Sequence, residues 1–365
     1  MKNISGQKIF KYGTLLLISI LAINHYAHVW YGPVSDKETG FPLQLVWETK
    51  LNDKIKEVYI TENGNILVQL GYSVNLISPK SGKLLWKFRT DKSIYSAASG
   101  DEKVYIFGDN SFIIVNEVNG KSSLEDYDNY SVNIPIDSYT NKNQILVTDY
   151  GSVSFYEIES GKFLYEHYVG RGRVGICLYS EFLYTFNNQI DVFSLKDAKH
   201  LWSENSFGYV DDNVCDGSSA YFIASDSNLV AYDLEARTKL WVKDFPVKDP
   251  YTLERVFSVD GLLIVEGINN IFIISKADGS VIHILSIQDN LTKDSLISSV
   301  AKINNNLYLF DGYSQSIYSF DINTWKQTGS LHLSFPNIIS TENERFININ
   351  DMLILWKNNR LFAYK

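Results

Sequence analysis

The sequence has few cysteines, few prolines and no excess of positive charge. Two cysteines among 365 residues are too few for a disulfide-built fold or a cysteine-based zinc site. Seven prolines and the lack of a long Gly/Ser tract argue against a disordered chain or a flexible linker. The net charge of −9 repels phosphate backbones, so the sequence predicts no nucleic-acid partner.

Aromatic and other apolar residues are abundant. The chain has 24 tyrosines and 20 phenylalanines, and 45% of its residues are hydrophobic. Aromatic and β-branched side chains fit the pleated, half-buried surfaces of strands. The composition therefore predicts a large β-rich core.

The N-terminal part of the chain has the pattern of a membrane anchor. A short segment over residues 1–11 carries three lysines, and an apolar stretch over residues 12–31 follows it. About 20 such residues are enough to span a bilayer as a helix. Because the lysines favour the inner side, the acidic body should lie outside the cytoplasm. We therefore expect a signal anchor over 12–31 and a linker over 32–41.

A cleaved signal peptide is the alternative for this segment. The small residues that a cleavage site needs are poorly placed, since Ala27 would put His25 at the −3 position. Both interpretations predict an extracytoplasmic body, either membrane-anchored at the periplasm or cell surface, or secreted after cleavage. No cysteine lies near the end of the apolar run, so a lipid anchor is not expected.

A turn recurs along the chain at intervals of roughly 40 residues, which is the signature of a repeat architecture. The clearest copy is Ser-Gly-Lys-Leu-Leu-Trp over residues 81–86, and each copy lies between two alternating strand patterns. The aligned turn positions are Gly82, Gly120, Gly161, Ala198, Arg237, Gly279 and Trp325.

Each repeat unit contains four short strand patterns. In the first unit they cover residues 57–60, 66–70, 74–77 and 84–88, with turns between them. Four antiparallel strands in roughly 40 residues form one blade of a β-propeller. The sequence thus predicts an all-β fold over residues 42–365, preceded by an N-terminal hydrophobic helix.

The number of units predicts eight four-stranded antiparallel blades. Seven units are complete, and the last has only three strand patterns before the C-terminus. Residues 43–48 match the missing fourth strand, so pairing between the two ends of the chain would close the ring. We expect such a closed ring to be a monomer.

An aromatic residue often follows the turn by four residues. Leu124, His283 and Gly329 replace it in three units, and we expect His283 to be structural. The turn with Gly-Lys followed by tryptophan resembles the docking repeat of the quinoprotein (PQQ) dehydrogenase-like eight-bladed propellers. The docking-motif residues expected from this resemblance are Trp47, Gly82, Trp86, Gly120, Gly161, Tyr165, Trp202, Trp241 and Gly279.

The resemblance implies a binding function and not catalysis. Enzymes of the superfamily hold the quinone with a free tryptophan, adjacent disulfide-bonded cysteines and calcium, whereas this chain has no adjacent cysteines. It is more similar to the non-enzymatic, BamB-like branch. We therefore predict no catalytic, cofactor-binding or metal-binding residues, and a membrane-tethered scaffold that docks envelope or membrane proteins on a propeller face. The alternatives are a PQQ-dependent dehydrogenase and a ligand-sensing ectodomain that acts through a partner.

Two residue pairs carry more specific expectations. Asp211 and Asp212 are expected in a solvated loop, as is usual in an acidic protein. Cys177 and Cys215 occupy nearly equivalent places in the first strands of neighbouring blades. In an oxidising compartment such a pair could form a bridge. Because packed sheets lie about 10 Å apart, beyond the reach of a disulfide, we expect instead that both thiols are free and buried.

Overall fold

The computed structural model describes residues 38–365 apart from short segments. The segments that it leaves out are residues 1–37, 109–110, 125–136, 141–143, 149–150, 158, 161, 170–174, 198, 205–209, 225–227, 246–252, 269, 287–295, 313 and 334–345. The described residues form strands and turns, and none of them belongs to a helix long and apolar enough to cross a membrane. The expected anchor over residues 12–31 lies outside them.

The strands form eight sheets, numbered here as blades in chain order from β3. The first four blades, each from its inner to its outer strand, are blade 1 with β3 (Glu57–Ile60), β4 (Ile66–Gln69), β5 (Ser73–Ile77) and β6 (Leu84–Arg89); blade 2 with β7 (Ile94–Gly100), β8 (Lys103–Gly108), β9 (Ser111–Asn116) and β10 (Ser122–Leu124); blade 3 with β11 (Asp137–Thr140), β12 (Gln144–Thr148), β13 (Ser152–Glu157) and β14 (Phe163–Tyr168); and blade 4 with β15 (Gly175–Tyr179), β16 (Phe182–Phe186), β17 (Ile190–Ser194) and β18 (His200–Glu204).

The second half of the chain continues the same order. Its blades are blade 5 with β19 (Val210–Asp216), β20 (Ser219–Ala224), β21 (Asn228–Asp233) and β22 (Thr238–Asp244); blade 6 with β23 (Leu253–Val259), β24 (Leu262–Gly267), β25 (Asn270–Ser275) and β26 (Val281–Ser286); blade 7 with β27 (Ile297–Ile303), β28 (Asn306–Asp311), β29 (Ser316–Asp321) and β30 (Gln327–His332); and blade 8 with β31 (Phe346–Ile349), β32 (Met352–Lys357), β33 (Arg360–Tyr364) and β2 (Leu45–Lys50).

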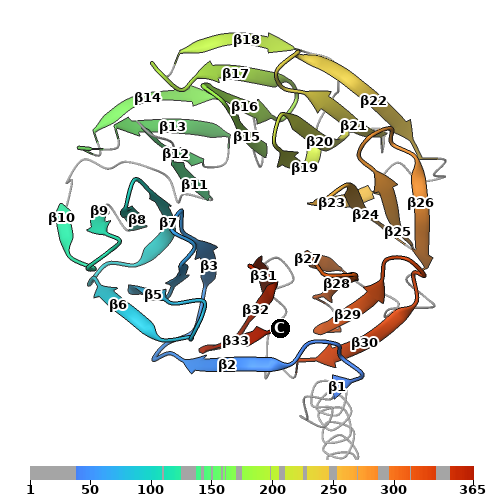
Figure 1. Ribbon diagram of the computed structural model, residues 1–365. Coiled ribbons are helices and arrows are strands. Elements are labelled where there is room, and N and C mark those ends of the chain that lie inside the picture. The colour runs from blue at the N-terminus through green and yellow to red at the C-terminus, as the bar shows by residue number, and fades with distance from the viewer. Residues whose placement is uncertain are drawn as a thin grey trace, which may run out of the picture.

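The blades stand around one axis, with the first strand of each blade innermost and the fourth at the rim (Figure 1). Neighbouring strands within a blade are antiparallel, as in the pairing of Leu67 in β4 with Leu76 in β5. This arrangement confirms the predicted all-β, eight-bladed propeller of four-stranded antiparallel blades.

Burial explains the sequence pattern of each blade. The middle strands are covered by sheets on both faces, so β4 and β12 are buried along their whole length, and each contains three consecutive apolar residues. The outer strands β2 and β6 instead alternate between exposed and half-buried residues. The apolar core lies between adjacent blades, as where Tyr105 and Phe112 of blade 2 pack with Ile145 of blade 3.

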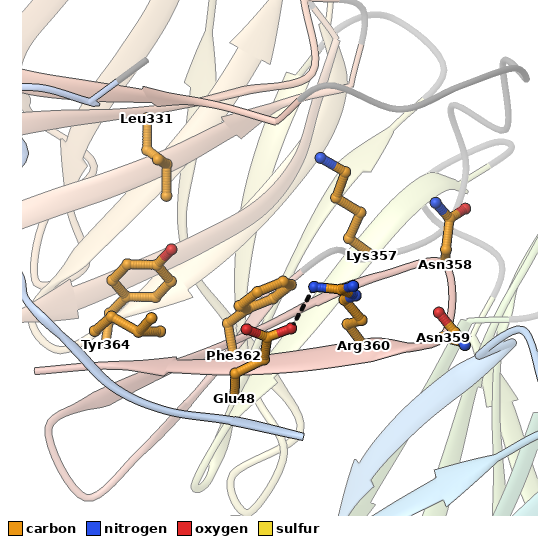
Figure 2. Close-up of a pocket in the computed structure, with 9 residues that line it drawn as sticks. Glu48, Leu331, Lys357, Asn358, Asn359, Arg360, Phe362 and Tyr364 are labelled. Carbon is orange, nitrogen blue, oxygen red and sulfur yellow. Dashed lines mark hydrogen bonds and ion pairs between the residues drawn. The ribbon is translucent and has the colours of Figure 1, made fainter. Parts of the chain in front are cut away.

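The two ends of the described chain close the ring. Strand β2 pairs with β33 in blade 8, which is the pairing expected from the unmatched strand patterns. Gln44 and Lys365 exchange two backbone hydrogen bonds of 2.9 Å at one end of this pair. At the other end, Arg360 and Glu48 form an ion pair of 2.6 Å (Figure 2). No blade is therefore left with three strands.

Blade 7 has a fifth strand that the sequence analysis did not anticipate. The short strand β1 (Glu38–Thr39) pairs with the outer strand β30 in antiparallel register. A Cβ atom on Gly329 would lie 2.3 Å from the carbonyl oxygen of Gly40. The aromatic residue is absent from this docking position because the N-terminal segment runs directly against it.

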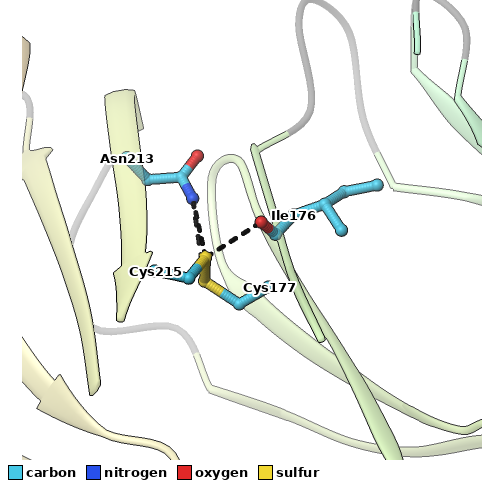
Figure 3. The surroundings of a disulfide bond; sticks show 4 residues. All are labelled: Ile176, Cys177, Asn213 and Cys215. Atoms are coloured by element: carbon cyan, nitrogen blue, oxygen red, sulfur yellow. Dashed lines mark hydrogen bonds between the residues drawn. A yellow bond between two sulfur atoms is a disulfide. The ribbon is translucent and has the colours of Figure 1, made fainter. Parts of the chain in front are cut away.

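The expectation of two free thiols is wrong. A disulfide joins Cys177 of β15 to Cys215 of β19, with the Cα atoms 5.7 Å apart (Figure 3). The spacing of about 10 Å between sheets packed face to face does not hold near the axis, because the innermost strands of adjacent blades converge there. Asn213 Nδ2 lies 3.8 Å from each sulfur, and the missing side chain of Gly175 leaves room for Asn213.

The expectation for the aspartate pair is also wrong. Asp211 and Asp212 belong to strand β19 and not to a loop, and of the two only Asp211 is exposed as expected. Asp212 Oδ2 accepts a 2.8 Å hydrogen bond from the backbone N–H of Val256 in the next blade. Partial burial raises the pKa of the Asp211 carboxyl above its usual range. Asp212 thus contributes to the contact between blades 5 and 6.

Candidate functional site

The tryptophan residues of the outer strands dock on the next blade. The indole N–H groups of Trp47, Trp86 and Trp241 donate to the backbone carbonyls of Pro79, Glu117 and Lys276, respectively. Each acceptor lies three residues before a turn glycine, so one indole contacts both the carbonyl at the start of the turn and the glycine at its end.

The turn glycines allow this close approach. A Cβ atom on Gly120 would lie 2.7 Å from Trp86 Cγ, and one on Gly279 would lie 2.8 Å from Trp241 Cε3. Gly82 makes the same contact with Trp47, and its φ of 66° is a conformation that glycine adopts without strain. The repeat signal that runs through the sequence is thus an interblade contact.

Two junctions keep the contact with different residues. At the junction of blades 4 and 5, the guanidinium of Arg237 lies 5.4 Å from the Trp202 ring in place of a glycine. The hydroxyl of Tyr184 donates to the Leu234 carbonyl, and among the described residues the Trp202 indole N–H has no acceptor. At the junction of blades 6 and 7, His283 stacks on Trp325. This contact agrees with a structural role for His283.

The junction of blades 3 and 4 contains Tyr165. Its ring packs against Phe155 and stacks on His167, with centroid distances of 6.4 and 6.3 Å. Gly161 and Ala198, two of the expected turn positions, lie outside the described residues. Of the nine expected docking residues, six form three Trp–Gly pairs and Trp202 packs against Arg237. Tyr165 belongs to an aromatic cluster, and Gly161 lies outside the described residues.

A cavity of about 530 Å³ lies at the seam between blades 7 and 8 (Figure 2). Leu331 of β30, Phe362 and Tyr364 of β33, and the Glu48–Arg360 ion pair contribute to its lining. Its lining combines the charged side chains of Glu48, Lys357 and Arg360 with the apolar side chains of Leu331 and Phe362.

A buried carboxyl group lies at the junction of blades 6 and 7. Glu266 is 1% exposed, and its Oε1 accepts a 2.6 Å hydrogen bond from the backbone N–H of Ile297. Its Oε2 has no hydrogen-bond partner among the described residues. Burial raises the pKa of Glu266 to about 8, against the opposing effect of that hydrogen bond. The neutral acid is thus favoured at neutral pH.

Sequence reasoning missed one group of titratable side chains. His167, Asp191 and His200 come from two blades and place one ligand atom each within 4.8 Å of the others. No sequence motif relates them, because only the docking of blade 3 on blade 4 brings His167 to the other two.

The comparisons with known proteins agree with this geometry. The family model described as outer membrane protein assembly factor BamB matches residues 36–241. The chain belongs to this family. No curated protein matches the chain in sequence.

Solved structures show the same fold. The crystal structure of BamB from Moraxella catarrhalis superposes with a TM-score of 0.66 and 10% identity, over 88% of this chain and 99% of that one. The computationally designed Ika8 protein superposes with a TM-score of 0.64 and 12% identity, over 86% of this chain and 98% of that one.

Proposed function

We propose that this protein is a non-catalytic scaffold of the cell envelope, tethered by residues 12–31 with the propeller outside the cytoplasm. The observation that carries the proposal is membership of the BamB family, whose description is that of an outer membrane assembly factor. An assembly factor for outer membrane proteins acts on other proteins, and a closed ring of blades offers a surface for such contacts.

We further propose that a partner binds at the rim of the ring. Most of the exposed large apolar side chains of the described residues lie on outer strands. In blade 5, Leu240 and Val242 of β22 are 50% and 49% exposed. In blade 6, Ile282 and Ile284 of β26 repeat this pattern. Such apolar side chains on unpaired strand edges are typical of sites for partner segments.

The chain itself shows how such an edge is used. Strand β1 adds to the outer edge of β30 through backbone pairing. Strands β22 and β26 are the last strands of their sheets, so they offer the same backbone groups to another chain. We therefore propose that an extended segment of an envelope protein pairs with one of these edges, with apolar side chains on alternate residues.

Crosslinking in intact membranes tests this function. The full chain is crosslinked and purified, and the attached proteins are identified by mass spectrometry. Val242→Asp on β22 and Ile284→Asp on β26 each change an exposed residue, so both should keep the melting temperature, and the variant on the occupied edge should lose the crosslinked partner. Recovery of the same partner with both variants would contradict docking at the rim.

A further inference from the structure

A histidine–carboxylate cluster lies where the outer strand of blade 3 meets blade 4. His167 comes from β14, Asp191 from β17 and His200 from β18. The His167 ring packs edge-on against Phe193, with a centroid distance of 4.8 Å, and His200 packs against the same ring at 5.2 Å. The two imidazoles are nearly parallel, with centroids 5.2 Å apart. Phe193 therefore fixes both histidines beside each other.

The carboxylate of Asp191 supplies the charge of the cluster. Asp191 is 1% exposed, and its Oδ1 lies 3.1 Å from His200 Nε2. Within the part of the chain that the structure describes, no lysine or arginine pairs with it, and the His200 imidazole is the one basic side chain within ion-pair distance. A buried carboxylate is stable only when a cation or several hydrogen bonds compensate its charge. The cluster thus has a negative site that faces two imidazoles.

Surrounding polar groups hold the three side chains in place. Gln189 Nε2 donates to both oxygens of Asp191 at 2.8 and 2.9 Å, and Ser203 Oγ donates to Oδ1. The hydroxyl of Tyr165 lies 3.4 Å from Nδ1 of His167, which leaves Nε2 of that ring for another contact. Outer groups that orient histidine and carboxylate ligands in this way are typical of metal sites.

We propose that His167, Asp191 and His200 bind one divalent transition-metal ion, for which Zn²⁺ is the reference. Two imidazole nitrogens and one carboxylate oxygen are ligands that Zn²⁺ accepts at about 2.0–2.2 Å, whereas Ca²⁺ and Mg²⁺ prefer oxygen. The ligand atoms lie within 4.8 Å of one another, and because the two rings are nearly parallel, one ring must rotate before both nitrogen lone pairs can point at the ion. The side chain of His200 is 33% exposed, which leaves a fourth position for water. The ion would link blade 3 to blade 4.

Zinc titration of the full chain, without a polyhistidine tag and after removal of metals with EDTA, tests the site. Calorimetry should show one Zn²⁺ per chain, and the melting temperature should rise with Zn²⁺. His167→Gln and His200→Gln should each weaken binding at least about 10- to 100-fold. His283→Gln is the matched control, because His283 stacks on Trp325 at another junction. It should bind Zn²⁺ as the wild type does.

X-ray absorption at the zinc edge keeps the test decisive if a variant fails to fold. The wild-type spectrum should show two imidazole ligands and oxygen donors. The proposal is overturned if the wild type does not bind Zn²⁺, if both glutamine variants bind it equally well, or if the spectrum lacks imidazole. In the first case the cluster would be only a hydrogen-bonded pair of His200 and Asp191.

Discussion

The ring of His283 lies parallel to the ring of Trp325, with centroids 5.3 Å apart and an interplanar angle of 8°. His283 occupies the strand position that tryptophan takes at other junctions, and Trp325 occupies the turn position that glycine takes there. The large and the small partner are exchanged, and the contact between the blades is kept. Trp325 has a φ of 55°, a conformation that costs tryptophan more than glycine.

This exchange predicts a rescue between two substitutions. Trp325→Gly alone should lower the free energy of unfolding by about 1–3 kcal/mol, because it removes the stacked ring. His283→Trp alone should also destabilise the protein through overpacking. The double variant restores the Trp–Gly pair of the other junctions, so we expect a favourable coupling of about 0.5–3 kcal/mol in urea unfolding. Additive effects would show that the two positions are independent.

The closure of the ring predicts unequal effects of two neighbouring residues in β33. Leu361 is fully buried between blades, so Leu361→Ala should cost about 2–5 kcal/mol. Arg360→Ala removes an exposed ion pair with Glu48 and should cost less than about 1 kcal/mol.

Deletion of residues 358–365 should abolish cooperative unfolding, because it removes the partner of both β32 and β2. Unchanged melting after this deletion would contradict closure by β33.

The disulfide predicts the result of thiol labelling. The denatured but unreduced protein should take up no label, and the reduced protein should take up two. Cys177→Ser with Cys215→Ser should lower the free energy of unfolding by about 2–4 kcal/mol, because the bond constrains the unfolded chain. Two labelled thiols in protein from an oxidising compartment would contradict the bond.

Glu266 predicts a dependence of stability on pH. Its pKa is raised from the ordinary value of 4.5 to about 8 in the folded protein, so the folded state binds the proton more tightly. The protonated Glu266 contributes fully to the free energy of unfolding below about pH 4.5. This contribution, on the order of a few kcal/mol, is lost as the pH rises to about 8.

Glu266→Gln isolates that contribution. The amide keeps an acceptor for the Ile297 N–H and cannot ionise, so the variant should lose less stability than the wild type between pH 5 and about 8. Urea unfolding at several pH values measures the difference. Parallel curves for the two proteins would mean that Glu266 does not hold its proton in the folded state.

The proposal of a non-catalytic scaffold predicts no quinone chemistry. The structural disulfide joins two blades and is not formed by adjacent cysteines. Trp47, Trp86 and Trp241 are engaged in interblade hydrogen bonds. Incubation with pyrroloquinoline quinone and calcium, followed by a dye-linked assay with alcohols and aldoses, should give background rates. Turnover above background would favour the dehydrogenase alternative.

The fold could be predicted from the sequence because the repeat is local. A strand, a turn and the docking residue of one blade lie within about 40 residues, so each unit carries its own signal. The features that were missed or wrong depend on contacts between units. The disulfide required the convergence of β15 and β19 near the axis, and the fifth strand of blade 7 required the path of Gly40 against Gly329. The periodicity of the sequence predicts neither the distance between β15 and β19 nor that between Gly40 and Gly329.

The site was less predictable for the same reason. His167, Asp191 and His200 form no spaced motif, and only the packing of blade 3 on blade 4 brings them together. The seam cavity likewise depends on the register between the two ends of the chain. Sequence patterns indicate the position of each strand along the chain but not which side chains meet across a junction.

Site-specific photo-crosslinking tests the central claim most directly. A photoreactive amino acid is placed at Val242 of β22 and Ile284 of β26, on the rim, and at Tyr72, which is equally exposed at 49% but lies in the turn between β4 and β5. After irradiation of intact membranes, the account predicts one discrete adduct with an envelope protein from position 242 or 284 and none from position 72. Adducts from position 72 alone, or none from either rim position, would contradict a scaffold that binds its partner at the rim.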